Sequence, residues 1–404
     1  MNNKNIGVIT LCGLIIGPVL GSGIVLLPPL AYKMIGEWSI LAWIFIMLLG
    51  VVFAYVFIFL SLESPGNEGV AIAVGNTLGN FWREVTSNFL STAVCFGPTA
   101  ILITAAEFLK NFSLFSNMNV MILAFGLEIV CVSILAFGVK TLARLTLILT
   151  GFTAVLLTLG SVYTLIFSSN IHFSGKQFSF SSFTHTLLLL FWAIIGWEVV
   201  GNYIEDIKDP KKTLKKAMTI SIIVIIFLYI IVALSLQNIS SKEYTIVAII
   251  TPLFGSFAAP LISVIASCLC ICTYLMIVGG VSRMNASRSI KNKLPSFLAH
   301  LNKSGSPINV IMTYFTIHCF ILLLAYLKIL NLDEILTSAN VFFLSNALIG
   351  LFTGFKLLKN VKLRIAIIIL IASFMFLLFR ASIWSLALLI MIFILTLYYR
   401  RVSA

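Results

Sequence analysis

Long apolar runs, separated by short polar or charged segments, fill almost the whole chain. A helix needs about 20 predominantly apolar residues to cross the hydrocarbon core of a membrane. About twelve runs reach or approach this length. No polar segment between them could hold a soluble domain of ordinary size. The pattern therefore predicts one all-α integral membrane domain over residues 1–404. The predicted spans are 7–32, 38–62, 83–109, 118–138, 142–167, 184–205, 216–237, 252–281, 307–329, 334–355, 362–379 and 383–399.

Two of these runs carry glycine-rich interruptions. The first span contains Gly-Pro-Val-Leu-Gly-Ser-Gly at 17–23, and the sixth contains Phe-Trp-Ala-Ile-Ile-Gly-Trp-Glu-Val-Val-Gly at 191–201. A helix broken inside a bilayer leaves backbone groups that water cannot reach, and each unpaired group costs several kcal/mol. Such breaks persist where they line a cavity. A matching pair in two halves of a chain is typical of a transporter's binding site.

The spacing of the two breaks predicts an inverted repeat. Five spans begin with the first broken run (7–167), and five begin with the second (184–355). An odd number of spans per repeat places the two halves in opposite membrane orientations. The last two spans (362–399) then lie outside the repeat.

Composition and charge fit the same class. Hydrophobic residues make up 60% of the chain and charged residues 10%, which excludes a soluble globular protein. The net charge of +13 follows the positive-inside rule if both termini are cytoplasmic. The basic clusters then face anionic lipid headgroups, and a nucleic-acid partner is not expected. Of the 26 Lys and Arg residues, only six fall on the outer side: Lys33, Lys110, Lys176, Lys242, Lys328 and Arg380.

The first break has the chemistry of an amino-acid receptor made of backbone. The half-helix that starts near Ile24 presents free amides and the positive end of its dipole, which suit a carboxylate. The half-helix that ends at 18–20 leaves carbonyls that suit an ammonium group. A glycine-rich helix crossing is the alternative, and the matching second break favours binding. The candidate binding residues are Val19, Gly21, Ser22, Gly23, Ile24, Trp192, Ile195 and Gly196.

Three further side chains have two open interpretations each. Trp192 flanks the second break, where an indole can gate a substrate or simply pack. Glu198 and Glu128 lie within apolar spans, where a carboxylate is functional by default. Glu198 is either a proton carrier or an acceptor for loose amides of the first break. Glu128 is either a proton site or a structural hydrogen-bond partner.

Catalytic and metal-binding patterns are missing from the sequence. The four His residues are scattered, and the seven Cys residues fall inside spans without ligand spacing. We therefore expect neither an enzyme, a bound metal nor a cofactor. The sequence also contains no nucleotide-binding loop, which favours secondary over primary transport.

Several motifs resemble those of one transporter superfamily. Gly-Ser-Gly-Ile at 21–24 with Leu27-Pro28 resembles the first-helix signature of the amino acid–polyamine–organocation superfamily. The segment 191–198 is similar to its sixth-helix signature, and 205–212 (Glu-Asp-Ile-Lys-Asp-Pro-Lys-Lys) to its acidic–Pro–basic loop. Residues 282–307 resemble the connection after its eighth helix. Bacterial exporters of methionine and branched-chain amino acids form the most similar subgroup.

The resemblance implies a LeuT-type fold, with five-plus-five inverted repeats, broken helices 1 and 6, and alternating access. It also implies that the substrate carboxylate meets the amides at 22–24. The substrate ammonium would meet the carbonyls of Val19, Trp192 and Ile195, with Trp192 as the gate.

One departure from the superfamily concerns ion coupling. Many proton-coupled relatives carry a lysine in the fifth helix, whereas 145–167 contains none and Thr153 lies near the expected place. Exchange without an ion, a proton on Glu198, or a sodium ion near Val19 all stay open, so coupling to H⁺ or Na⁺ is undecided.

These observations together predict a secondary exporter or exchanger of neutral, apolar L-amino acids in a bacterial inner membrane. The breaks offer no acidic pair for a cationic side chain, which favours a neutral substrate over the alternative of an amine, polyamine or cationic amino acid. An alternative from another class is a membrane sensor or assembly partner that transports nothing. The oligomeric state is not readable from the sequence.

Overall fold

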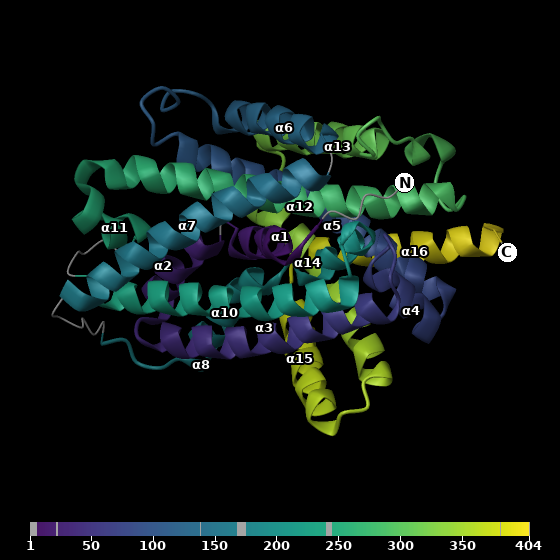
Figure 1. Ribbon diagram of the computed structural model, residues 1–404, viewed down its shortest axis with the longest axis horizontal. Coiled ribbons are helices and arrows are strands. Elements are labelled where there is room, and N and C mark those ends of the chain that lie inside the picture. Colours follow the sequence, from purple (N-terminus) through teal and green to yellow (C-terminus); the bar gives the residue numbers. More distant parts are fainter. Residues whose placement is uncertain are drawn as a thin grey trace.

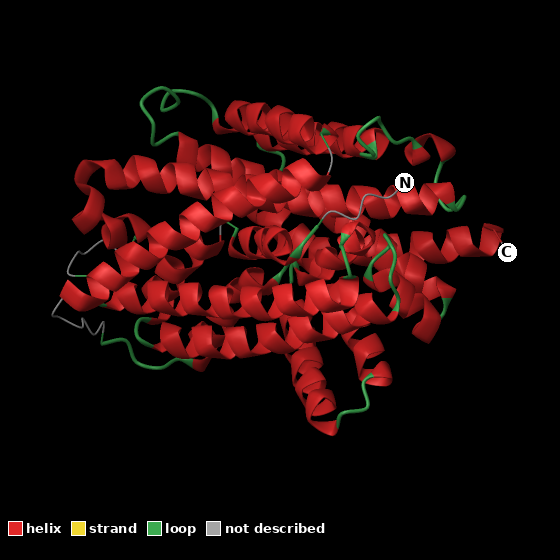
Figure 2. Cartoon of the chain, viewed as in Figure 1, coloured by secondary structure: helices red, strands yellow, loops and turns green. Residues whose placement is uncertain are grey.

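The computed structural model describes residues 6–21, 23–137, 139–167, 175–239, 245–379 and 381–403. Helices make up almost all of this part of the chain (Figure 2), and its strand-like pairing is a single parallel bridge between Ile6 and Ile207. The first half contains α1 (Val8–Leu20), α2 (Gly23–Ile35), α3 (Trp38–Glu63), α4 (Val70–Leu78), α5 (Asn80–Leu109), α6 (Val120–Ala136) and α7 (Val139–Phe167). The second half contains α8 (Phe180–Leu190), η1 (Phe191–Ile194), α9 (Trp197–Val200), η2 (Gly201–Asp206), α10 (Pro210–Gln237), α11 (Ile246–Phe254), η3 (Gly255–Phe257), α12 (Ala258–Ile290), η4 (Ser296–Ala299), α13 (Ile308–Tyr326), α14 (Leu332–Leu357), α15 (Val361–Phe379) and α16 (Ile383–Ser403).

The membrane-spanning pattern agrees with the sequence prediction. Within the described residues, 10 helical stretches are long and apolar enough to cross a membrane. Two shorter apolar helices, Val120–Ala136 and Ile383–Tyr399, fall on the predicted fourth and twelfth spans. The all-α, multi-pass architecture with about twelve spans is therefore confirmed.

Some helices extend beyond the predicted spans. The predicted eighth span ends at 281, but α12 continues to Ile290. Its last turns contain basic residues that pair with acidic residues of other elements, as Arg283 does with Asp206. The stretch 63–81 was expected to be a connection, yet it contains α4.

The bundle places α1 at its centre and α12 between two groups of helices. α1 packs against α7, α10 and α12, while α12 also packs against α5, α6 and α13. In Figure 1, α6 and α13 lie side by side along one edge of the bundle, and α15 projects from the opposite edge. α12 therefore has one face toward the broken first helix and another toward the α6–α13 pair.

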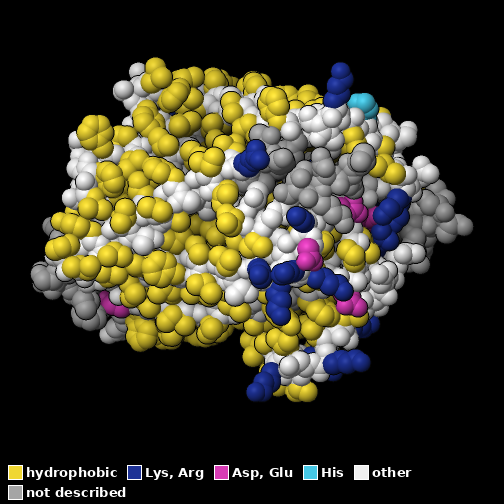
Figure 3. All heavy atoms as spheres, in the orientation of Figure 1, with side chains coloured by type: hydrophobic (Ala, Val, Ile, Leu, Met, Phe, Trp, Pro, Cys, Tyr) yellow, Lys and Arg dark blue, Asp and Glu magenta, His cyan; other side chains and the backbone are white. Residues whose placement is uncertain are grey.

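Charged side chains gather toward one end of the molecule. Figure 3 shows apolar side chains over most of the visible face, with Lys, Arg, Asp and Glu concentrated toward the end where α4 lies in Figure 1. Ion pairs at this end join Glu68, Glu84 and Asp206 to basic residues of α5, α12 and the segment after α12. Such a division is typical of a protein whose apolar belt lies in a bilayer.

Glu68 is the most enclosed carboxylate of this charged end. Its side chain is fully buried and accepts two hydrogen bonds from Arg83, of 2.8 and 2.9 Å, and one of 2.6 Å from Lys291. Burial by itself would raise the pKa of Glu68, but the hydrogen bonds and charges of Arg83 and Lys291 outweigh it and lower the pKa below its ordinary value. Glu68 thereby ties the α3–α4 connection to α5 and to the end of α12.

We expect Glu68→Gln to lower the free energy of unfolding by roughly 2–4 kcal/mol, because Arg83 and Lys291 lose their shared carboxylate. A lowered pKa means that this stabilisation is present above the ordinary glutamate value and is lost as the pH falls through the lower, folded-state pKa. The apparent Tm in detergent, measured from pH 7 downward, checks both points. Glu63→Gln, at the exposed end of α3, is the matched control. Equal Tm values for the two variants at pH 7 would contradict this role.

Candidate functional site

The first break lies between α1 and α2. Gly21 adopts φ 43° and ψ −147°, which favours glycine, and its amide donates to the Gly17 carbonyl at 2.7 Å. Ser22, a predicted binding residue, lies outside the described residues. α2 begins directly afterwards at Gly23, so the amides of Gly23 and Ile24 occupy its first turn, where an α-helix offers them no internal acceptor.

The carbonyls at the broken end of α1 accept hydrogen bonds from hydroxyl groups of two helices that are distant in the sequence. The Tyr229 hydroxyl of α10 lies 3.2 Å from both the Val19 and the Leu20 oxygens. The Thr273 hydroxyl of α12 lies 3.2 Å from the Pro18 oxygen and 2.9 Å from that of Leu269. A carbonyl oxygen has two lone pairs, so Val19 can accept from Tyr229 and still accept from a ligand ammonium.

The second break is longer than the first and faces it. α8 ends at Leu190, residues 191–194 form a tighter helical turn, and Ile195 is extended. Gly196 then adopts φ 122°, and α9 begins at Trp197. A Cβ atom on Gly196 would lie 3.4 Å from the Val19 side chain and 3.5 Å from that of Met276. The structure therefore brings the predicted residues Val19 and Gly196 together.

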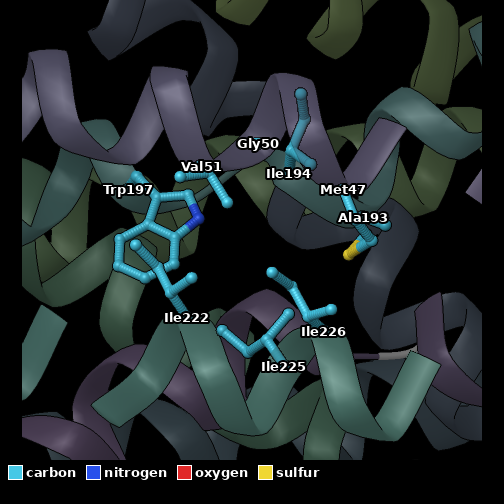
Figure 4. A pocket seen from close by; sticks show the side chains of 9 residues that line it. All are labelled: Met47, Gly50, Val51, Ala193, Ile194, Trp197, Ile222, Ile225 and Ile226. Atoms are coloured by element: carbon cyan, nitrogen blue, oxygen red, sulfur yellow. The ribbon is translucent and has the colours of Figure 1, made fainter. Parts of the chain in front are cut away.

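Trp192 and Trp197 leave the second break in different surroundings. Trp192 is half-buried. A Cβ atom added to Gly23 would lie 3.7 Å from the Cδ1 atom of Trp192. Trp192 is thus placed over the start of α2. Trp197 is buried and instead lines an apolar pocket between α3, the second break and α10 (Figure 4). That pocket is formed by Met47, Gly50, Val51, Ala193, Ile194, Trp197, Ile222, Ile225 and Ile226.

Glu198 accepts a hydrogen bond from the backbone of the second break. Its side chain is buried, and Oε2 accepts a 3.0 Å hydrogen bond from the Gly196 amide. A contact of Glu198 with the amides of the first break stays a prediction, because Ser22 lies outside the described residues. The contact with Gly196 has a local cause: a carboxylate in the first turn of α9 can fold back onto an unpaired amide two residues earlier.

Glu128 lies away from both breaks, on α6. It is fully buried and contacts His318 of α13 at 2.9 Å and the Tyr274 hydroxyl of α12 at 3.3 Å. Both candidate carboxylates are thus hydrogen-bonded, but only Glu128 has a titratable nitrogen as its partner. Among the described residues, no group of three or more His, Cys, Asp and Glu could hold a metal ion.

Sequence reasoning missed two contributors to this geometry. Tyr229 was not singled out, although it is a lone hydroxyl in a long Ile-rich stretch of α10 and Trp43 of α3 stacks on it with ring centroids 4.6 Å apart. His318 was grouped with scattered histidines, although it falls in the middle of an apolar span. An isolated polar side chain deep in an apolar run is the signal that could have found both.

Comparison with known proteins decides the family. The family model described as "Amino acid permease" matches residues 6–402. The chain belongs to the amino acid permease family. The membership accounts for the observed fold, and it makes this chain a multi-pass membrane transporter of amino acids and not an enzyme.

Three similar proteins are all amino acid transporters by name. The L-methionine/branched-chain amino acid exporter YjeH of Escherichia coli (strain K12) is 24% identical over 355 residues, covering 86% of this chain and 85% of the exporter. The cadaverine/lysine antiporter of the same organism is 26% identical over 333 residues, covering 75% and 71%. The serine/threonine exchanger SteT of Bacillus subtilis (strain 168) is 24% identical over 284 residues, covering 65% and 62%.

Proposed function

We propose that this permease is a secondary active transporter that exports or exchanges neutral, apolar L-amino acids by alternating access. Its proposed location is a bacterial cytoplasmic membrane, with both termini on the cytoplasmic side, as the distribution of Lys and Arg favours. The observation that carries the proposal is the facing pair of breaks, where Val19 of the first lies against Gly196 of the second.

The backbone of the two breaks suits the groups that all amino acids share. The substrate carboxylate would lie at the start of α2, against the amides at 22–24, where the helix dipole also favours an anion. The substrate ammonium would lie against the carbonyls of Val19, Trp192 and Ile195. Trp192, half-buried beside Gly23, is then the gate.

The surrounding side chains favour a neutral substrate. Those placed within van der Waals reach of Gly23 and Gly196 include Leu27, Trp192 and Met276. The acid of the second break, Glu198, already accepts the Gly196 amide. A cationic side chain would need a free carboxylate here, so an apolar side chain such as that of leucine or methionine fits better. A relative named as a methionine and branched-chain exporter supports the same choice.

Counterflow in proteoliposomes tests the proposal. The purified protein is reconstituted with an unlabelled amino acid inside, and entry of labelled Leu, Ile, Val, Met or Phe is followed. We expect at least one of these to enter faster when unlabelled substrate is inside, because an exchanger carries one substrate molecule out for each molecule that it brings in. The proposal fails if none of them enters. Lys and Glu serve as comparison substrates, and empty liposomes give the background.

The same assay separates the two alternatives. The relative named as a cadaverine/lysine antiporter makes a cationic substrate the second candidate, and lysine or cadaverine would then compete where leucine does not. A sensor would bind an amino acid, with a rise in apparent Tm, but show no counterflow of any substrate.

A further inference from the structure

Glu128, His318 and Tyr274 form a fully buried polar cluster away from both breaks. They come from α6, α13 and α12 respectively, and each has 0% exposure. Glu128 Oε1 lies 2.9 Å from His318 Nδ1, and the Tyr274 hydroxyl lies 3.3 Å from each of these two atoms. A carboxylate and an imidazole inside a membrane cost free energy unless they pair with each other, and such pairs mark functional sites such as proton relays.

The hydrogen bonds fix how many protons the pair holds. His318 Nε2 lies 2.8 Å from the Val94 carbonyl oxygen of α5, and a carbonyl only accepts, so Nε2 carries a hydrogen. Nδ1 and Glu128 Oε1 are then at hydrogen-bond distance, which requires one further proton between them. Whether that proton resides on the carboxyl or on the imidazole, the pair is neutral overall and holds a single transferable proton.

Among the described residues, the neighbouring titratable groups supply no charge that could replace this proton. They are Tyr274 and Cys270 of α12, Cys131 of α6, Tyr314 and Cys319 of α13, and Cys95 of α5. Phenols and thiols are neutral near pH 7. Arg288, which acts on Tyr314, is itself paired with Glu84 at 2.8 Å. Losing the proton would therefore leave a buried carboxylate with Tyr274 as its main donor, so release requires contact with water.

α12 connects this cluster to both breaks. Thr273 and Tyr274 are adjacent, so their side chains leave the helix about 100° apart. Thr273 donates to the Pro18 carbonyl of the first break, and Met276 lies beside Gly196 of the second. If a change in the shape of the two breaks moves α12, the distances from Tyr274 to Glu128 and His318 would therefore change as well.

We propose that Glu128 and His318 form the coupling-proton site of this transporter, an inference that rests on the proposed secondary transport. In each cycle the proton between Oε1 and Nδ1 passes to water, leaving a Glu128 carboxylate that accepts from Tyr274 and a neutral imidazole. A proton from the opposite side of the membrane restores the pair. Glu198 is not assigned this role because its carboxylate accepts a hydrogen bond from a backbone amide and, among the described residues, has no titratable hydrogen-bond partner.

Glu128→Gln is the sharpest variant, because a carboxamide can donate to Nδ1 and accept from Tyr274 while holding no transferable proton. The assay uses proteoliposomes with a trapped pH-sensitive dye and labelled L-leucine or L-methionine, whichever wild type exchanges. We expect an imposed pH gradient to drive wild-type accumulation several-fold above counterflow equilibrium, with dye-reported proton movement. In Glu128→Gln the accumulation and the proton movement should both fall to the levels measured without a pH gradient, while counterflow continues.

Two carboxylate-to-amide controls accompany it. Glu107→Gln, at an exposed position of α5, should behave as wild type. Glu198→Gln should retain the ratio of gradient-driven to counterflow transport, even if both rates change. The inference is overturned if wild type shows counterflow but an imposed pH gradient causes neither accumulation nor dye-reported proton movement, or if the ratio is lost in Glu198→Gln and kept in Glu128→Gln. Absence of counterflow in wild type instead contradicts the proposed function itself.

Discussion

Gly23→Leu is expected to abolish amino-acid counterflow although the protein still inserts in the membrane. A Cβ atom at Gly23 would lie 2.8 Å from the Tyr229 hydroxyl oxygen, closer than van der Waals contact allows, and 3.7 Å from Trp192 Cδ1. A leucine adds three more carbons at the point where α2, α10 and the second break meet. Its side chain would cover the amides proposed to hold the substrate carboxylate.

The expected loss is large because a charge is involved. Hydrogen bonds to a charged group contribute about 1.5–3 kcal/mol each, and overpacking costs about 1–3 kcal/mol. Losing two such bonds should weaken substrate affinity at least about a hundredfold. The measurements are the concentration dependence of counterflow and the substrate-induced rise in apparent Tm, with membrane insertion checked by expression and size-exclusion profile.

Gly151→Leu is the matched control for this substitution. Gly151 lies on an exposed face of α7, and no atom lies within 4 Å of its Cβ position. This variant should retain wild-type counterflow. Unchanged affinity in Gly23→Leu would refute the backbone receptor, whereas equal losses in both variants would indicate a general intolerance of bulk.

The parts of this site that the sequence predicted are those with local causes. Glycine and proline within an apolar run mark a break wherever the run lies in the fold, so α1 ends at Leu20 and α8 at Leu190, close to the predicted interruptions. The ten long apolar helices of the described residues and the two shorter ones follow from length and hydropathy for the same reason. The twofold repeat, the gate and the coupling ion remain predictions.

The parts that the sequence did not predict depend on long-range packing. Tyr229 lies 210 positions from Val19, Thr273 lies 255 positions from Pro18, and His318 lies 190 positions from Glu128. Periodicity identifies the apolar face of a helix but not which distant helix will pack against it. Glu198 shows that a short-range contact can also go unpredicted, since the Gly196 amide that donates to it is only two positions away. There the backbone angle at Gly196 decides which amide is free.

The second large effect is expected at Gly196, whose backbone angle holds the second break open. Its φ of 122° with ψ −25° is a conformation that residues with a Cβ atom rarely adopt. Gly196→Ala should therefore cost roughly 1–3 kcal/mol of backbone strain. The added methyl itself meets ordinary contact distances of 3.4 Å to Val19 and 3.5 Å to Met276, so the effect would come from the backbone rather than from crowding.

Two outcomes follow for the strained variant. Either the break keeps its shape and the apparent Tm falls, or φ relaxes and moves the Gly196 amide away from Glu198 Oε2, now 3.0 Å distant. In the second case we expect counterflow to fall by about tenfold or more, since a loss of 1.4 kcal/mol of binding free energy already corresponds to a factor of ten in affinity. Counterflow and apparent Tm, measured on the same preparation, distinguish the two.

Gly126→Ala supplies the comparison that isolates the backbone angle. Gly126 lies within α6 without a positive φ, and nothing lies within 4 Å of its Cβ position. The same methyl group there should leave the free energy of unfolding unchanged or raise it by about 0.5–1 kcal/mol. If Gly196→Ala matched Gly126→Ala in both Tm and counterflow, the second break would tolerate an ordinary helical residue. The facing pair of breaks could then not be the feature on which transport depends.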